Sequence, residues 1–113
     1  MIYRVTATFK PDTANELRQR LDDGSIAAQR PDGLEIVDSL HRAVVRNTGQ
    51  VMWSEQCYCQ PPLAHERATI LDRYFDGVTT EAIADYERYD GRPFMEYLDT
   101  IVEPPSIRQT PRH

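Results

Sequence analysis

The chain has 113 residues, the length of one domain with a single hydrophobic core. Its 40% apolar and 27% charged residues exclude a disordered or fibrous chain, and its apolar runs are far too short to span a membrane. Acidic side chains outnumber basic ones by 18 to 13, with most of the excess in residues 76–103, so we expect no nucleic-acid partner. No apolar signal segment begins the chain, which predicts a cytoplasmic protein with no membrane partner.

The first predicted elements are a strand and a helix. Residues 2–9 alternate, with apolar side chains at positions 3, 5, 7 and 9, which is typical of a half-buried strand. Thr13 and Glu16 have the spacing of a capping box. The apolar residues that follow at spacings of three and four predict a helix that stops at Gly24.

A hairpin is predicted in the middle of the chain. Residues 34–45 and 50–59 form two strand-like runs, and Asn47 and Gly49 in the connection between them are typical of a tight turn. Residues 34–45 carry apolar side chains at both even and odd positions, so we expect a sheet that is apolar on both faces. Since helices cover only one face, we expect a second copy of the chain to cover the other, in a homodimer. The alternative is that the C-terminal segment covers it.

A second helix is predicted over residues 61–77. Two prolines in its first turn and a glycine at its end are typical of helix termini. The next residues leave two alternatives open, namely a fourth strand over residues 78–83 or a helix over residues 80–89.

The C-terminal part predicts a short helix over residues 93–102, which closes a single domain over residues 1–103. Residues 104–113 hold three prolines and few apolar side chains, so we expect a flexible tail. The order strand, helix, hairpin, helix and strand is the βαββαβ pattern of ferredoxin-like folds. We therefore expect an α+β domain with an antiparallel sheet, helices on one face and a C-terminal helical extension.

The clearest group of potential metal ligands consists of Cys57, Cys59 and His65. The two thiols share one face of a predicted strand, and His65 follows within one turn of the next helix. Thiolate and imidazole are ligands of zinc and copper, so these residues are candidate metal ligands. The C-x-C spacing differs from the C-x2-C of zinc knuckles, and two buried reduced cysteines are the alternative.

His41, Glu55 and Tyr58 are the candidate catalytic residues. His41 in an apolar strand layer would suit a general base, and a buried Glu55 would have a raised pKa and could exchange a proton. The alternatives are a core or interface histidine and a glutamate exposed at a sheet edge. Glycine-rich phosphate loops and the common hydrolase motifs are absent from the sequence, which disfavours nucleotide-dependent and hydrolytic classes.

Three segments resemble the dimeric α+β-barrel superfamily, which includes antibiotic-biosynthesis-type monooxygenases and muconolactone-isomerase-like proteins. They are MIYRVTATFKPD, PDGLEIVDSLHRAV and VMWSEQ, and the resemblance covers roughly residues 1–75. It implies two sheets paired into a barrel, with a small-molecule cavity in many members. Some members are cofactor-free oxygenases, isomerases or haem-binding proteins. No set of catalytic residues transfers position by position, and the acidic segment after Gly77 departs from the pattern.

Three functions follow from these observations. The first is a homodimeric module that binds a small ligand or a protein partner, with no cofactor. The second is a cofactor-free monooxygenase or isomerase that uses His41, Glu55 and Tyr58 in a cavity. The third is a metal-binding protein that uses the two cysteines and His65. The enzyme hypothesis requires at least two of its residues on one pocket wall, and the metal hypothesis requires its three ligand groups to converge.

Overall fold

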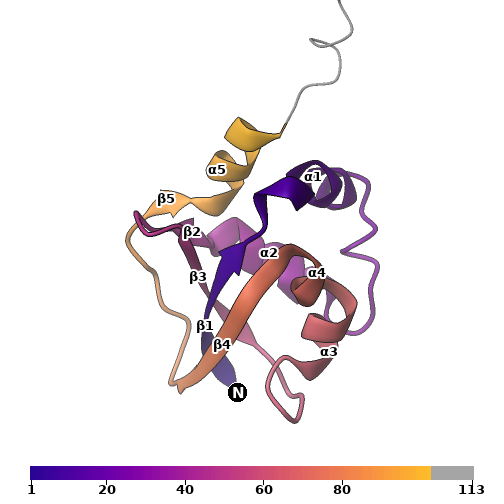
Figure 1. The fold of residues 1–113 in the computed structure, drawn as a ribbon. Coiled ribbons are helices and arrows are strands. Elements are labelled where there is room, and N and C mark those ends of the chain that lie inside the picture. Colours follow the sequence, from indigo (N-terminus) through magenta and orange to yellow (C-terminus); the bar gives the residue numbers. More distant parts are fainter. Residues whose placement is uncertain (103–113) are drawn as a thin grey trace, which may run out of the picture.

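Five strands form one antiparallel sheet in the computed structural model, which describes residues 1–102 (Figure 1). The sheet order is β4-β1-β3-β2-β5. The strands are β1 (Ile2–Phe9), β2 (Val44–Val45), β3 (Gln50–Gln56), β4 (Phe75–Ile83) and β5 (Arg92–Pro93). β1 lies between β3 and β4, and its alternating burial confirms the strand predicted over residues 2–9.

Helical segments occupy the connections between strands, and the last of them follows the final strand. They are η1 (Pro11–Thr13), α1 (Ala14–Asp22), α2 (Gly33–Arg42), α3 (Ala64–Glu66), η2 (Arg67–Leu71), α4 (Asp72–Tyr74) and α5 (Phe94–Ile101). α5 packs against both α1 and α2, and α2 packs against β3. The buried side chains of β1 join those of the helices in one hydrophobic core. No helix within residues 1–102 is long and apolar enough to cross a membrane.

The strand predicted over residues 34–45 is wrong, because residues 33–42 form α2 and only Val44–Val45 are strand. The buried positions of this segment are Gly33, Ile36, Ser39 and Leu40, which recur at helical spacing. Glu35 in the first turn and Arg42 in the last turn complement the helix dipole. β-branched residues at Ile36 and Val37 imitate a strand pattern, but the period of burial is that of a helix.

This correction removes the basis of the predicted homodimer. The outer face of the sheet carries Arg4 and Thr6 on β1 and Ser54 on β3, so it is not the second apolar face that was expected. Residues 84–91 cross this face, because Ser54 Oγ accepts a hydrogen bond from the backbone N–H of Glu87 at 3.0 Å. The homodimer stays a prediction.

The elements predicted after residue 60 agree better with the structure than the strand predicted over residues 34–45. β4 continues to Ile83, which confirms the fourth strand and makes the alternative helix over residues 80–89 wrong. α5 confirms the predicted C-terminal helix. The predicted helix over residues 61–77 spans Ala64–Tyr74, and its last residues belong to β4 instead. The predicted tail, residues 104–113, lies outside the described residues.

The predicted capping box is also wrong. Thr13 Oγ1 donates to the carbonyl of Lys10 at 2.7 Å instead of capping α1. Glu16 instead faces α4, where its Oε1 accepts a hydrogen bond from Arg73 Nη2 at 2.8 Å and its Oε2 accepts one from Tyr74 Oη at 2.7 Å. Glu16 therefore has the spacing of a capping residue, but its hydrogen bonds connect α1 to α4.

Candidate metal site

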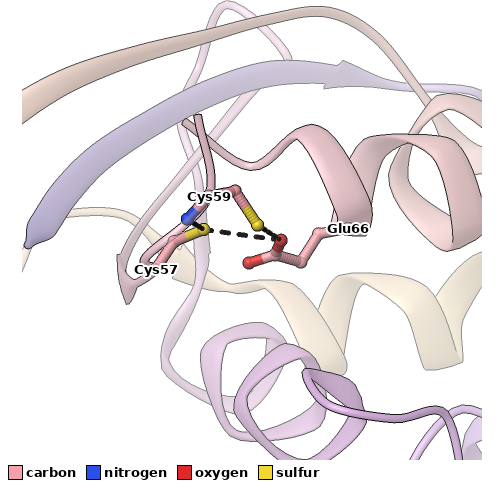
Figure 2. A group of neighbouring side chains, drawn as sticks. All are labelled: Cys57, Cys59 and Glu66. Atoms are coloured by element: carbon pink, nitrogen blue, oxygen red, sulfur yellow. Dashed lines mark hydrogen bonds between the residues drawn. The ribbon is translucent and has the colours of Figure 1, made fainter. Parts of the chain in front are cut away.

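Two thiols and a carboxyl group meet behind the end of β3 (Figure 2). The strand ends at Gln56, and the chain then turns, so that the backbone N–H of Cys59 donates to Cys57 Sγ at 3.1 Å. Both sulfur atoms lie 3.5 Å from Glu66 Oε1. The turn, and not the alternation of a strand, therefore brings the two thiols to one point.

Glu66 reaches this point because of how its helix begins. Leu63 precedes α3 with φ 61° and ψ 18°, a left-handed conformation that costs a non-glycine residue about 1–2 kcal/mol. The Leu63 side chain is fully buried, which offsets this cost. Three residues later, Glu66 lies on the same buried side of the helix, with 0% of its surface exposed.

A second buried carboxyl group, Glu55 on β3, lies next to Glu66. Only 1% of Glu55 is exposed, and its Oε1 accepts a hydrogen bond from Trp53 Nε1 at 2.8 Å. Oε2 of Glu55 and Oε2 of Glu66 have no hydrogen-bond partner in the described part of the chain outside this pair of carboxyl groups. Burial raises the pKa of Glu55 well above its ordinary value, and hydrogen bonding to the Glu66 carboxyl raises that pKa further. Such a bond requires a proton on one of the two carboxyl groups.

The Cys57 thiol shows the same effect of burial. Burial raises the pKa of Cys57 to about 12, while hydrogen bonds from the backbone N–H groups of Cys59 and Leu63 act in the opposite direction. Backbone N–H groups directed at a sulfur atom stabilise a thiolate. Without a cation this thiol therefore stays protonated, although its backbone surroundings are suited to the charged form.

The site is a cluster of four acidic groups without a positive counterpart. Among residues 1–102, no basic side chain forms a hydrogen bond or ion pair with Cys57, Cys59, Glu55 or Glu66. Buried charges in proteins are paired with opposite charges or coordinate metals, and an unpaired buried oxygen costs about 1–3 kcal/mol. Cys57 and Glu55 favour their protonated forms without a cation, and a divalent cation that displaces thiol protons would balance the negative charges this creates.

The spacing of the donor atoms fits such a cation. The ligand atoms of Cys57, Cys59 and Glu66 all lie within 4.8 Å of one another. Zinc binds sulfur at about 2.3 Å and carboxylate oxygen at about 2.0 Å, so a tetrahedral S–Zn–O angle separates the two donors by about 3.5 Å. Both sulfur–oxygen distances in the site are 3.5 Å. A small relaxation of the side chains would thus hold a zinc-sized ion.

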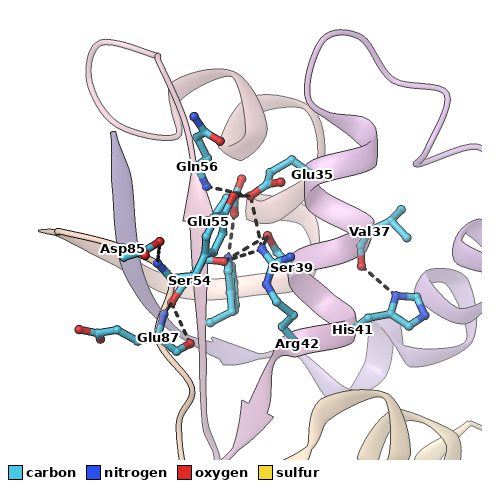
Figure 3. Close-up of polar contacts among 12 residues, drawn as sticks. Glu35, Val37, Ser39, His41, Arg42, Ser54, Glu55, Gln56, Asp85 and Glu87 are labelled. Atoms are coloured by element: carbon cyan, nitrogen blue, oxygen red, sulfur yellow. Dashed lines mark hydrogen bonds and ion pairs between the residues drawn. The ribbon is translucent and has the colours of Figure 1, made fainter.

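An open groove adjoins the two cysteines and has a volume of about 470 Å³. Its lining residues are Pro31, Asp32, Glu35, Gln56, Cys57, Tyr58 and Cys59. Two of these lining residues are fixed by hydrogen bonds. Asp32 Oδ2 lies 2.6 Å from His65 Nδ1. Glu35 Oε2 accepts a hydrogen bond from the backbone N–H of Gln56 at 2.8 Å (Figure 3).

The structure separates the predicted ligand His65 from the two cysteines. Its ring turns to Asp32, and the neighbouring Glu66 takes the place beside the sulfur atoms. Successive residues on a helix point about 100° apart, so only one of the two can face the thiols. The sequence analysis missed Glu66, although the apolar spacing of Leu63 and Ile70 places position 66 on the buried side of a helix.

The predicted catalytic residues do not come together. His41 is exposed on α2, where its Nδ1 lies 2.9 Å from the carbonyl oxygen of Val37 (Figure 3). Tyr58 lines the groove but is 81% exposed, and Glu55 is buried behind it. Of the three, only Tyr58 is among the residues that line this groove. The cofactor-free enzyme hypothesis therefore gains no support from their positions.

No family model, no curated protein and no solved structure matches this chain. The dimeric α+β-barrel resemblance thus stays a prediction. What supports a function is the geometry and the chemistry of the site itself.

Proposed function

We propose that the protein binds one divalent transition-metal ion of the zinc class through Cys57 Sγ, Cys59 Sγ and Glu66 Oε1. The observation that carries this proposal is the convergence of two thiols and a fully buried carboxyl group at 3.5 Å, with no basic side chain of residues 1–102 bonded to any of them. The backbone N–H of Cys59 that is directed at Cys57 Sγ supports it, because such a donor stabilises a thiolate ligand.

The donor types favour zinc and its relatives over the hard cations. Calcium and magnesium take oxygen ligands, whereas thiolates select softer metals. Two sulfur donors and one carboxylate make a mixed set that suits Zn²⁺ or Co²⁺. Metal binding would displace the thiol protons, and the N–H groups directed at Cys57 Sγ would then stabilise the thiolate.

The alternative is a pair of cysteines buried only as small apolar side chains. That alternative gives no reason for the place of the buried Glu66 carboxyl group within 3.5 Å of both sulfur atoms. Free cysteines used for packing need no carboxyl partner. The metal site accounts for the sulfur atoms and for the acid together.

We also infer a ferredoxin-like arrangement for the core of the sheet. The order β4-β1-β3-β2 and the antiparallel pairing of each neighbouring pair support it. α1 and α2 lie between β1 and β2 in the chain, and α3 to α4 lie between β3 and β4, as the βαββαβ pattern requires. In this arrangement β5 and α5 are an addition at the edge of the sheet that ends in β2.

The test is metal binding by the full chain and by isosteric variants. We expect calorimetry and elemental analysis to show one Zn²⁺ or Co²⁺ per chain, with sulfur-to-cobalt charge-transfer absorption. Cys57→Ser, Cys59→Ser and Glu66→Gln should each weaken binding by at least about 100-fold, since even outer partners of metal ligands contribute 10- to 100-fold.

His65→Gln is the matched control, because His65 neighbours Glu66 but faces Asp32. It should retain the affinity of the unmodified protein within a few-fold. Absence of stoichiometric binding would overturn the proposal. A loss in His65→Gln as large as that in Glu66→Gln would overturn the assignment of Glu66 as the ligand.

A further inference from the structure

We propose that the metal keeps one coordination position open to the groove, and that this position takes a small neutral nitrogen donor, an imidazole or an amine, in preference to an anion. The inference rests on the proposed metal site and specifies what that site can bind. It identifies the site as one that exchanges ligands, in contrast to a closed structural site.

The number of protein ligands is the first reason. Only Cys57, Cys59 and Glu66 place donor atoms within 4.8 Å of one another in the described residues. Glu55 does not belong to this set, and its Oε1 already accepts the indole N–H of Trp53. Structural zinc sites have four protein ligands, whereas sites with three keep a position for water or another exogenous ligand.

The groove is the second reason, because it gives that position access to solvent. Both metal-binding cysteines line the groove, and Cys59 is only partly buried. A volume of about 470 Å³ lies within the range of small-molecule pockets. A ligand of a few heavy atoms can therefore reach the sulfur side of the site without unfolding any element.

Charge decides the class of ligand. Two thiolates and one carboxylate outweigh the two positive charges of the metal by one, so the loaded site is anionic. The groove walls add the carboxyl groups of Asp32 and Glu35, and its seven lining residues include no lysine or arginine. The anionic metal site and these carboxylates would repel an entering anion, and the pairing of Glu35 with Arg42 at 3.4 Å offsets part of this repulsion.

The experiment uses the full chain loaded with Co²⁺, whose ligand-field absorption changes when an exogenous ligand binds. Imidazole and sodium azide are titrated separately, and equilibrium dialysis confirms that cobalt stays on the protein. We expect saturable spectral changes with imidazole, and at least about 10-fold weaker binding of azide. Glu35→Gln removes one carboxylate from the groove wall and should narrow the difference between azide and imidazole binding.

Glu96→Gln is the control, because Glu96 is exposed on α5 and pairs with Arg92. It should bind imidazole as the unmodified protein does. A spectrum that neither probe changes, removal of cobalt by imidazole, or azide binding as tight as imidazole would each overturn the inference while the metal site stands. If Co²⁺ itself fails to bind, the proposed function fails and this inference fails with it.

Discussion

The indole N–H of Trp53 donates to Glu55 Oε1 across 2.8 Å, and both side chains are buried on β3. Residues two apart on a strand lie on the same face, so this contact follows from the strand itself. It holds one oxygen of Glu55 in place, while the carboxyl group also lies against that of Glu66. Because Trp53 is the only tryptophan of the chain, its fluorescence reports directly on this part of the site.

The Trp53–Glu55 contact predicts different effects for two substitutions of Glu55. Glu55→Ala removes the acceptor of a buried N–H and leaves a cavity, which should lower the free energy of unfolding by about 2–4 kcal/mol. Glu55→Gln keeps an oxygen for Trp53 and should stay within about 1 kcal/mol of the unmodified protein. Urea unfolding of the metal-free chain, followed by Trp53 fluorescence, measures both. Equal destabilisation by the two substitutions would contradict the contact.

Ser54 should control how tightly residues 84–91 lie on the outer face of the sheet. Its buried Oγ accepts the backbone N–H of Glu87 at 3.0 Å and lies 3.0 Å from Tyr89 Oη. Removing this hydroxyl leaves those groups without their buried partner. Ser54→Ala should therefore speed hydrogen exchange in residues 84–91 by roughly 5- to 10-fold.

Ser39 offers the matched control for this experiment. It is as deeply buried as Ser54, but it lies on α2, and its Oγ makes no hydrogen bond to residues 84–91. Ser39→Ala should leave the exchange of that segment unchanged. If both substitutions speed exchange there equally, the effect comes from a general loss of stability and not from the Ser54 contact.

The pairing of Glu16 with Arg73 predicts a pH dependence of stability. Hydrogen bonds from Arg73, and then from Tyr74, lower the pKa of Glu16 from 4.5 to about 2. The unfolded chain binds a proton at the higher pKa, so the contribution of Glu16 is fully present above pH 4.5 and is lost as the pH falls towards 2. The contribution is modest because both groups are solvent-exposed and screened by salt.

Glu16→Gln isolates this effect from the other acids. The difference in thermal midpoint between the unmodified protein and the variant should be largest near pH 6 and should shrink between pH 4.5 and 2. Thermal unfolding followed by circular dichroism at constant ionic strength measures it. A difference that is the same at pH 6 and pH 2 would show that Glu16 acts through packing and not through charge.

Part of the fold could be predicted from the sequence because its pattern is local. The alternation of residues 2–9 and the helical spacing of residues 93–102 each identified the right element. The prediction of a strand over residues 34–45 was wrong because β-branched side chains and closely spaced apolar positions suit both a buried strand and a helix. The hydrophobic core resolved that ambiguity, since burying Ile36 and Leu40 together requires helical spacing.

For the candidate site, too, the sequence predicted one part and not another. By itself, the sequence identified the Cys57–Cys59 pair, because side chains two positions apart share one face of an extended chain. It did not show that Glu66, and not His65, is their partner. That choice depends on the rotation of α3 about its axis, which the left-handed Leu63 and the buried Leu63 side chain set through contacts far away in the chain. Only the tertiary structure decides such an angle, because it is the packing of the whole core that selects which side of a short helix faces inward.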